Sequence, residues 1–156
     1  MKVTPPINTA NVDWIVFRVP ELYLNYAEAL NEYYDVPPQE AFDAVFKVRD
    51  RSGMPAFHVN LNKNEFREKL HTERGVEFAF EDHRFWDIRR WLIAENEGVM
   101  RGEMYGLNIN SIDGSRTNVH YEPYVFEVRS WSRRSYLHPI MQDEVDKGYL
   151  IQNPGW

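Results

Sequence analysis

The sequence predicts a mainly α-helical fold: a helical hairpin, further helices, and a loop-rich segment that carries a small β-hairpin. Two stretches with apolar residues at helical spacing, residues 20–33 and 39–52, flank the pair Pro37-Pro38. A loop of a few residues between two helices favours an antiparallel helical hairpin. From residue 96 onward this periodicity fades, and glycines at positions 98, 102, 106 and 114 divide the chain into short segments.

Length and composition limit the classes of function. The chain has 156 residues, a net charge of -6 and no cysteine. It is long enough to bury a core, and its acidic balance argues against nucleic-acid binding. Without cysteine there is no disulfide, thiolate metal site or cysteine nucleophile. No apolar run approaches the roughly 20 residues that span a bilayer, and residues 1–6 lack the apolar region of a signal peptide.

The first two helices have recognisable ends. Pro20 fits the first helical position, where its missing N–H has no partner to lose. The second helix follows Pro38 and is expected to end before Gly53, which suits the left-handed conformation after a helix terminus. A hairpin with this much apolar surface needs neighbouring hairpins to cover it, as in helical repeat arrays.

A third helix is expected to begin near Asn62, capped reciprocally with Glu65, and to run toward Phe80. Gly75 weakens its middle and predicts close packing or a kink there. A further helical segment covers residues 84–92, and a short helical turn covers residues 142–147. Six rings at helical spacing are predicted to pack in the core: Tyr26, Tyr33, Phe42, Phe46, Phe78 and Phe80.

The β-hairpin is predicted between residues 97 and 134. Residues 111–114 form a turn signal, and residues 121–131 alternate in part, which puts Tyr124, Phe126 and Val128 on one side. Pro123 restricts this stretch to an edge or interrupted strand.

No catalytic or metal-binding template is present. The five histidines (58, 71, 83, 120 and 138) include no i, i+4 pair that would form a metal site on one helix face. Carboxylates could serve a glycosidase, which needs a pair of them. The candidates lie among Arg74, Arg84, Arg89 and Arg90, so structural ion pairs are the favoured interpretation; the candidates are Glu73, Glu77, Glu81, Asp82 and Asp87.

Aromatic residues make up 15% of the chain, and some lie in segments without amphipathic order. Flat rings exposed on loops can stack on sugars, whose hydroxyl groups need polar neighbours such as Asn108 and Arg129. Packing in the core or at an edge remains the alternative for each ring. The aromatic residues in question are Trp14, Tyr105, Tyr121, Tyr124 and Trp131.

Four ordered motifs resemble those of the SusD/RagB-like family. Residues 73–91, ERGVEFAFEDHRFWDIRRW, are similar to the signature E-R-x-x-E-[LF]-x-[FY]-E-x-x-R-[FW]-[FW]-D-[LI]-R-R-W. Residues 18–29, RVPELYLNYAEA, and residues 48–55, VRDRSGMP, are similar to two further family motifs. Residues 136–140, YLHPI, and 152–156, QNPGW, resemble its C-terminus, with Met141 where the family has a second proline.

The resemblance implies a non-enzymatic protein with no cofactor and no metal. Family members bind oligosaccharides, cap a SusC-like TonB-dependent transporter and are lipid-anchored on the outer surface of the outer membrane. Their fold is mostly α-helical, with tetratricopeptide-like hairpins that hold a loop-rich part. The signal peptide and lipidated cysteine of such a protein would precede Met1.

The resemblance covers only the C-terminal portion of the family, so we expect residues 1–156 to be one C-terminal SusD/RagB-like region of a longer protein. We expect a lead-in at 1–19, helices at 20–95, an irregular part with the hairpin at 96–135 and a tail at 136–156. The missing N-terminal part, an oligosaccharide or polysaccharide and the transporter are the expected partners.

Trp131, Tyr121 and Tyr124 are the predicted glycan contacts. Two alternatives remain. The first alternative is a helical-repeat interaction module without glycan binding of its own, whose open apolar face would dock a protein. The other alternative is a glycosidase that uses two of the carboxylates named above.

Overall fold

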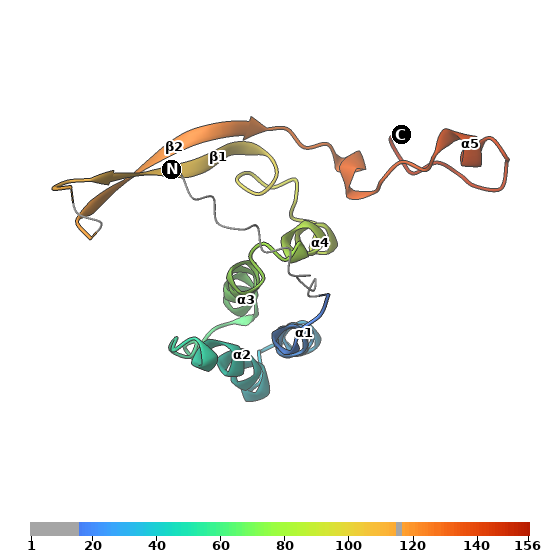
Figure 1. Ribbon diagram of the computed structural model, residues 1–156. Helices are drawn as coiled ribbons and strands as arrows, with labels where there is room; N and C mark the ends of the chain where they lie inside the picture. The colour runs from blue at the N-terminus through green and yellow to red at the C-terminus, as the bar shows by residue number, and fades with distance from the viewer. Residues whose placement is uncertain (1–15, 115–116) are drawn as a thin grey trace, which may run out of the picture. The chain divides into compact units, whose positions relative to one another are not determined.

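The computed structural model describes residues 16–114 and 117–156. Trp14 and most of the predicted lead-in at 1–19 thus lie outside the described residues. The chain divides into two compact units, one ending at Arg84 and one beginning at Phe85 (Figure 1). The elements in order are α1 (Val19–Tyr33), α2 (Gln39–Arg51), α3 (Lys63–Glu77), α4 (His83–Arg90), β1 (Gly102–Ser111), β2 (Val119–Arg129), the 3-10 helix η1 (Arg133–Tyr136) and α5 (Gln142–Val145). None of the helices in these ranges is long and apolar enough to cross a membrane.

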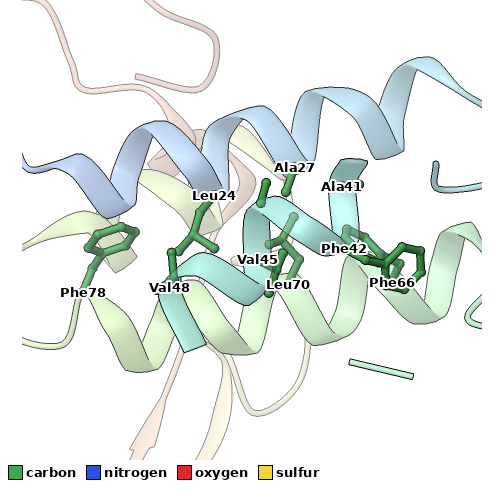
Figure 2. Packing of buried hydrophobic residues seen from close by; sticks show 10 residues of the cluster. Leu24, Ala27, Ala41, Phe42, Val45, Val48, Phe66, Leu70 and Phe78 are labelled. Carbon is green, nitrogen blue, oxygen red and sulfur yellow. The ribbon is translucent and has the colours of Figure 1, made fainter. Parts of the chain in front are cut away.

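The first unit has a hydrophobic core between α1, α2 and α3 (Figure 2). Leu24 and Ala27 of α1 face Val45 of α2, and all three are fully buried. Phe42 of α2 meets Phe66 of α3 edge to face, with ring centroids 4.9 Å apart. The predicted mainly helical fold, opening with an α1–α2 hairpin, is confirmed.

Two helix ends follow the sequence signals closely. The Asn62 side chain accepts hydrogen bonds from the backbone N–H of Asn64 and Glu65, both at 3.0 Å, and Glu65 accepts one from the Asn62 backbone at 2.8 Å. This is the predicted reciprocal cap. After α2, Gly53 adopts a φ of 67°, and the Met54 backbone N–H bonds to the carbonyl of Arg49 at 3.0 Å. Such a 6→1 bond is the mark of a Schellman terminus.

The predicted extension of the third helix to Phe80 is wrong. α3 ends at Glu77, because Phe80 and Asp82 have φ values of 66° and 62° that interrupt a right-handed helix. Of the two alternatives predicted for Gly75, close packing or a kink, close packing is wrong, since a Cβ there would have no neighbour within 4 Å.

The prediction of core aromatics is confirmed for two rings and wrong for four. Phe42 and Phe78 are buried, at 7% and 2% exposure. The other four are exposed. Three of them lie on α1 or α2, where helical periodicity identifies a stripe but not whether another element covers it, and Phe80 lies beyond the end of α3. The exposed fractions are 50% for Tyr26, 81% for Tyr33, 40% for Phe46 and 101% for Phe80.

The predicted β-hairpin is present as the antiparallel pair β1–β2 in the second unit. The register shifts between Met104 and Tyr105, where β2 contains one extra residue. Because a bulge interrupts the alternation of side chains, the predicted single side for Tyr124, Phe126 and Val128 is wrong. Tyr124 pairs with Gly106 before the bulge, whereas Val128 pairs with Glu103 after it.

Candidate functional site

One face of the β-hairpin is apolar and exposed. Cross-strand partners share a face of a two-stranded sheet, and rows two residues apart lie on the same face. Three such rows join Tyr105 to Val125, Leu107 to Pro123, and Ile109 to Tyr121. Five of the six are between 43% and 63% exposed, and Pro123 is exposed as well. We call these six residues the apolar hairpin face.

The predicted contact Tyr121 lies on this face and is 56% exposed. Tyr124 lies three residues along the same strand and therefore on the opposite face. Its ring covers Gly106, since a Cβ at that glycine would lie 3.0 Å from two ring carbons. Tyr124 thus packs against the backbone of β1 on one side and remains 44% exposed on the other.

The third predicted contact, Trp131, lies beyond the end of β2 and is half-buried. Its ring meets Tyr136 edge to face, with centroids 5.4 Å apart, and the guanidinium carbon of Arg89 lies 5.1 Å from its centroid. Trp131 therefore has protein contacts on two sides. The structure does not bring the three predicted residues together on one surface.

A fourth ring, Tyr105, shares the apolar hairpin face with Tyr121. The two lie on rows four residues apart along the strands, or about 14 Å at 3.4 Å per residue. Tyr105 is 63% exposed, and its hydroxyl group donates a hydrogen bond to Glu103, which raises the pKa of Tyr105. Sequence reasoning counted Tyr105 among the loop aromatics but did not pair it with Tyr121, because that pairing requires the strand register.

Among the residues that the structure describes, four of the five candidate carboxylates form structural ion pairs, but only Asp87 pairs with one of the predicted arginines, Arg90. The other three pair with Arg18, Arg49 and Arg51, which belong to the two earlier motifs. Arg18 donates two hydrogen bonds to the Glu81 carboxylate, at 2.8 and 2.9 Å, and also pairs with Glu77. The Arg18 guanidinium lies over the Phe78 ring, 4.7 Å from its centroid, and His83 stacks on the same ring at 4.4 Å. One arginine before α1 thus holds the segment that follows α3.

The middle motif is linked to the same segment. Arg49 of α2 pairs with Glu73, and Arg51 donates to Glu77 at 2.7 Å. In the other direction Arg74, which is only 3% exposed, donates to the Asn25 side chain of α1 at 2.6 Å. Residues from all three motifs therefore belong to one polar network around the helical core.

These pairs bear on the glycosidase alternative. A general acid in such an enzyme needs a raised pKa. The hydrogen bond from Arg18 instead lowers the pKa of Glu81. Asp87 is buried and bonds to Arg90 at 2.9 Å. Four of the five candidate carboxylates hold the scaffold together in this way, and Asp82 is the exception. Within residues 16–114 and 117–156, no group of side chains is arranged to hold a metal ion.

The C-terminal motif closes on itself through side chains. The Gln152 amide bonds to both the N–H and the carbonyl of Ile140, each at 2.8 Å. The Trp156 indole N–H donates to the carbonyls of Arg134 and Leu137, at 3.1 and 3.0 Å. The two parts of this motif, YLHPI and QNPGW, are therefore paired segments of one tail.

Comparison with known proteins agrees with this reading of the motifs. The sequence profile of the SusD family matches residues 4–156. The chain belongs to the SusD family. The SusD-like protein P38 of Formosa agariphila is 32% identical over 121 residues, which cover 72% of this chain and 22% of that protein. The SusD-like protein P25 of the same organism is 39% identical over 80 residues, 49% of this chain and 15% of that protein.

A solved SusD-like structure supports the fold as well. A SusD-like protein from Bacteroides fragilis superposes with a TM-score of 0.75 at 34% identity, over 92% of this chain and 26% of that one. A SusD superfamily protein from Parabacteroides distasonis has the same fold, with a TM-score of 0.61 at 22% identity. This SusD-family chain spans about a quarter or less of the length of these curated relatives and solved structures.

Proposed function

We propose that the chain is a non-catalytic part of a cell-surface SusD-like protein that captures oligosaccharides and delivers them to a SusC-like TonB-dependent transporter. Family membership supports the general role. The observation that carries it to this chain is the exposed ring of Tyr121 on the apolar hairpin face. An exposed ring offers a flat surface to the C–H groups of a sugar. The amides of Asn108 and Asn110 lie on the opposite face of the hairpin, which they share with Tyr124, and would serve a sugar bound on that side.

Tyr124 and Trp131 are the other proposed glycan contacts. Because Tyr121 and Tyr124 face opposite sides of the hairpin, one sugar ring cannot stack on both. We therefore assign the leading role to Tyr121, with Tyr105 further along the same face. Trp131 would contribute through the part of its ring that its neighbours leave exposed.

Calorimetric titration with a panel of neutral oligosaccharides tests the proposal. For any glycan that binds, Tyr121→Ala should weaken binding by about tenfold, the usual size of one lost aromatic contact. Tyr33→Ala is the matched control, because that ring is 81% exposed on α1, outside the proposed contacts, and its loss should leave binding unchanged. If no glycan gives heat with the unmodified chain, this segment has no glycan site of its own.

The same family membership leads us to propose the setting of the whole protein. Residues 1–156 would form a single C-terminal SusD-like region, and the longer protein would be lipid-anchored at the outer-membrane surface. Membrane fractionation of cells that express the full gene, with and without inhibition of lipoprotein processing, measures this placement.

A helical-repeat interaction module is the second candidate, and α1 supplies the observation that favours it. Five exposed residues of α1 follow the 3-4-3-4 spacing of a helix-packing seam: Val19, Leu22, Tyr26, Ala29 and Tyr33. Leu24, Ala27 and Asn31, on the other side of α1, are buried. A seam of this kind suits a neighbouring helix.

Self-association separates this candidate from the first. If the seam docks a helix, the isolated chain should associate at high concentration, and Leu22→Glu should return it to a monomer. Sedimentation velocity over a range of concentrations measures both. A monodisperse monomer at every concentration would count against the interaction module and would leave glycan binding untouched.

A further inference from the structure

A cluster of aromatic rings in the second unit surrounds one guanidinium. Arg89 lies in the last turn of α4, and its Nη1 donates to the Phe85 carbonyl at 2.9 Å. The guanidinium carbon lies 3.6 Å from the centroid of the Phe85 ring and 5.1 Å from that of Trp131. Tyr136 contacts the Trp131 ring from the side. We call Phe85, Arg89, Trp131 and Tyr136 the Arg89 cage.

Two N–H donors in the cage have no acceptor among residues 16–114 and 117–156. The Arg89 Nε and the Trp131 Nε1 are both shielded from solvent, and neither forms a hydrogen bond to any residue that the structure describes. Buried donors are nearly always paired, because an unpaired one loses its bond to water without replacement. Two unpaired donors on side chains in mutual contact indicate that an acceptor belongs there.

The charge of Arg89 is also unmatched. Hydrogen bonds to Glu81 and Glu32 raise the pKa of Arg18 and Arg67, respectively. Burial instead lowers the pKa of Arg89, and no carboxylate of the described residues pairs with it. A partly buried cation without a counter-charge favours an anion over a neutral acceptor.

We propose that the Arg89 cage binds a carboxylate group through the guanidinium of Arg89 and the indole N–H of Trp131. A carboxylate is planar and matches the guanidinium fork with its two oxygens, and each oxygen keeps a lone pair that can accept from the indole N–H. Arg89 and Trp131 are partly exposed as whole side chains, and Tyr136, the fourth residue of the cage, lines an open cavity of about 770 Å³. The site shares Trp131 with the proposed glycan contacts but does not depend on the contacts on the hairpin.

The carboxylate could be carried by a sugar acid or by an acidic side chain, and the probes separate these sources. The ¹⁵N-labelled chain is titrated at constant ionic strength with acetate, glucuronate and the peptide Gly-Glu-Gly, and with glucose as the neutral probe. Indole and arginine Nε–H resonances are followed by NMR, and Trp131→Phe assigns the indole signal. Carboxylates should shift the Trp131 and Arg89 signals along a saturable curve, whereas glucose should not.

Substitutions give the expected magnitudes. Arg89→Gln should abolish saturable binding, and Arg89→Lys, which keeps the charge but not the fork, should weaken it about tenfold, as for one charge-assisted hydrogen bond. Arg101→Gln is the matched control: its side chain is 60% exposed, it lies outside both the cage and the cavity beside Tyr136, and its loss should leave the titration unchanged. The Lys variant keeps the test valid if the Gln variant does not fold.

The outcomes are distinct. If glucuronate binds at least tenfold more tightly than acetate and the peptide, the result supports a site for sugar acids. If all three bind with equal affinity, it supports a site for carboxylate side chains. No saturable shift with any carboxylate, or the same curve in Arg89→Gln, overturns the proposal. Failure here leaves the hairpin free to bind neutral glycans, and failure of glycan binding leaves this site intact.

Discussion

The Arg18 guanidinium connects two segments that are about sixty residues apart in sequence. It bonds to Glu81 through two nitrogens, and its side chain is only 20% exposed. In this setting each charge-assisted bond stabilises more than a surface pair, because solvent screens it less. The carboxylate partners are therefore a source of pH-dependent stability.

Replacing Arg18 should show this dependence. Arg18→Gln should lower the free energy of unfolding by about 1–3 kcal/mol at pH 7. The folded pKa of Glu81 lies below its unfolded value, so the stabilisation is present above the unfolded pKa and is lost as pH falls through the folded one. Urea unfolding of both proteins at pH 7, 5 and 3 should therefore give curves that converge at the lowest pH. A constant difference at all three values would contradict the assignment.

Two glycines offer an opposed pair of substitutions. Gly53→Ala should destabilise by about 1 kcal/mol, because its φ of 67° is left-handed. Gly75→Ala should stabilise by about 0.5–1 kcal/mol, because it lies inside α3 and a new Cβ would meet nothing within 4 Å. Thermal unfolding measures both, and each variant is the control for the other. Changes of the same sign would contradict the backbone explanation.

At the scale of elements, the sequence predicted what local chemistry decides. The Asn62 cap, the Gly53 terminus and the α1–α2 hairpin depend on residues close together in the chain, and all three are confirmed. The exposure of Tyr33 and the opposite orientations of Tyr121 and Tyr124 depend on which elements meet and in which register. No local pattern contains that information, so the candidate site was predicted as residues and not as a surface.

The C-terminal tail is held by hydrogen bonds from side chains instead of the backbone hydrogen bonds of a β-sheet. Gln152→Ala removes both hydrogen bonds to the Ile140 backbone, so amide exchange at Ile140 should rise about tenfold or more. Gln142→Ala is the control, since the Gln142 amide donates to Asp146 on the exposed surface and not to the Ile140 backbone. Hydrogen exchange followed by NMR resolves the two positions. Unchanged protection of the Ile140 amide from exchange would mean that the hydrogen bonds of Gln152 do not hold the tail.

At the scale of the whole molecule, the two units differ in how much they bury. All ten residues of the hydrophobic cluster lie between Leu24 and Phe78, in the first unit. In the described part of the second unit, the buried apolar residues are Ile88, Ala94 and Met104. A two-stranded hairpin is marginally stable without further packing, so the second unit has less to hold it folded.

Unfolding should therefore occur in two steps that different signals report. The fluorescent side chains of the second unit are Trp86, Trp91, Trp131 and Trp156. Most of the helical residues, which give the dichroism signal, lie in α1, α2 and α3. In a Trp14→Phe background, tryptophan fluorescence should change at a lower urea concentration than circular dichroism at 222 nm. Leu70→Ala, which should cost about 2–5 kcal/mol in the helical core, should move the dichroism midpoint and leave the fluorescence midpoint in place. Coincident transitions that both shift with Leu70→Ala would show a single cooperative unit, because two-state unfolding requires every probe to agree.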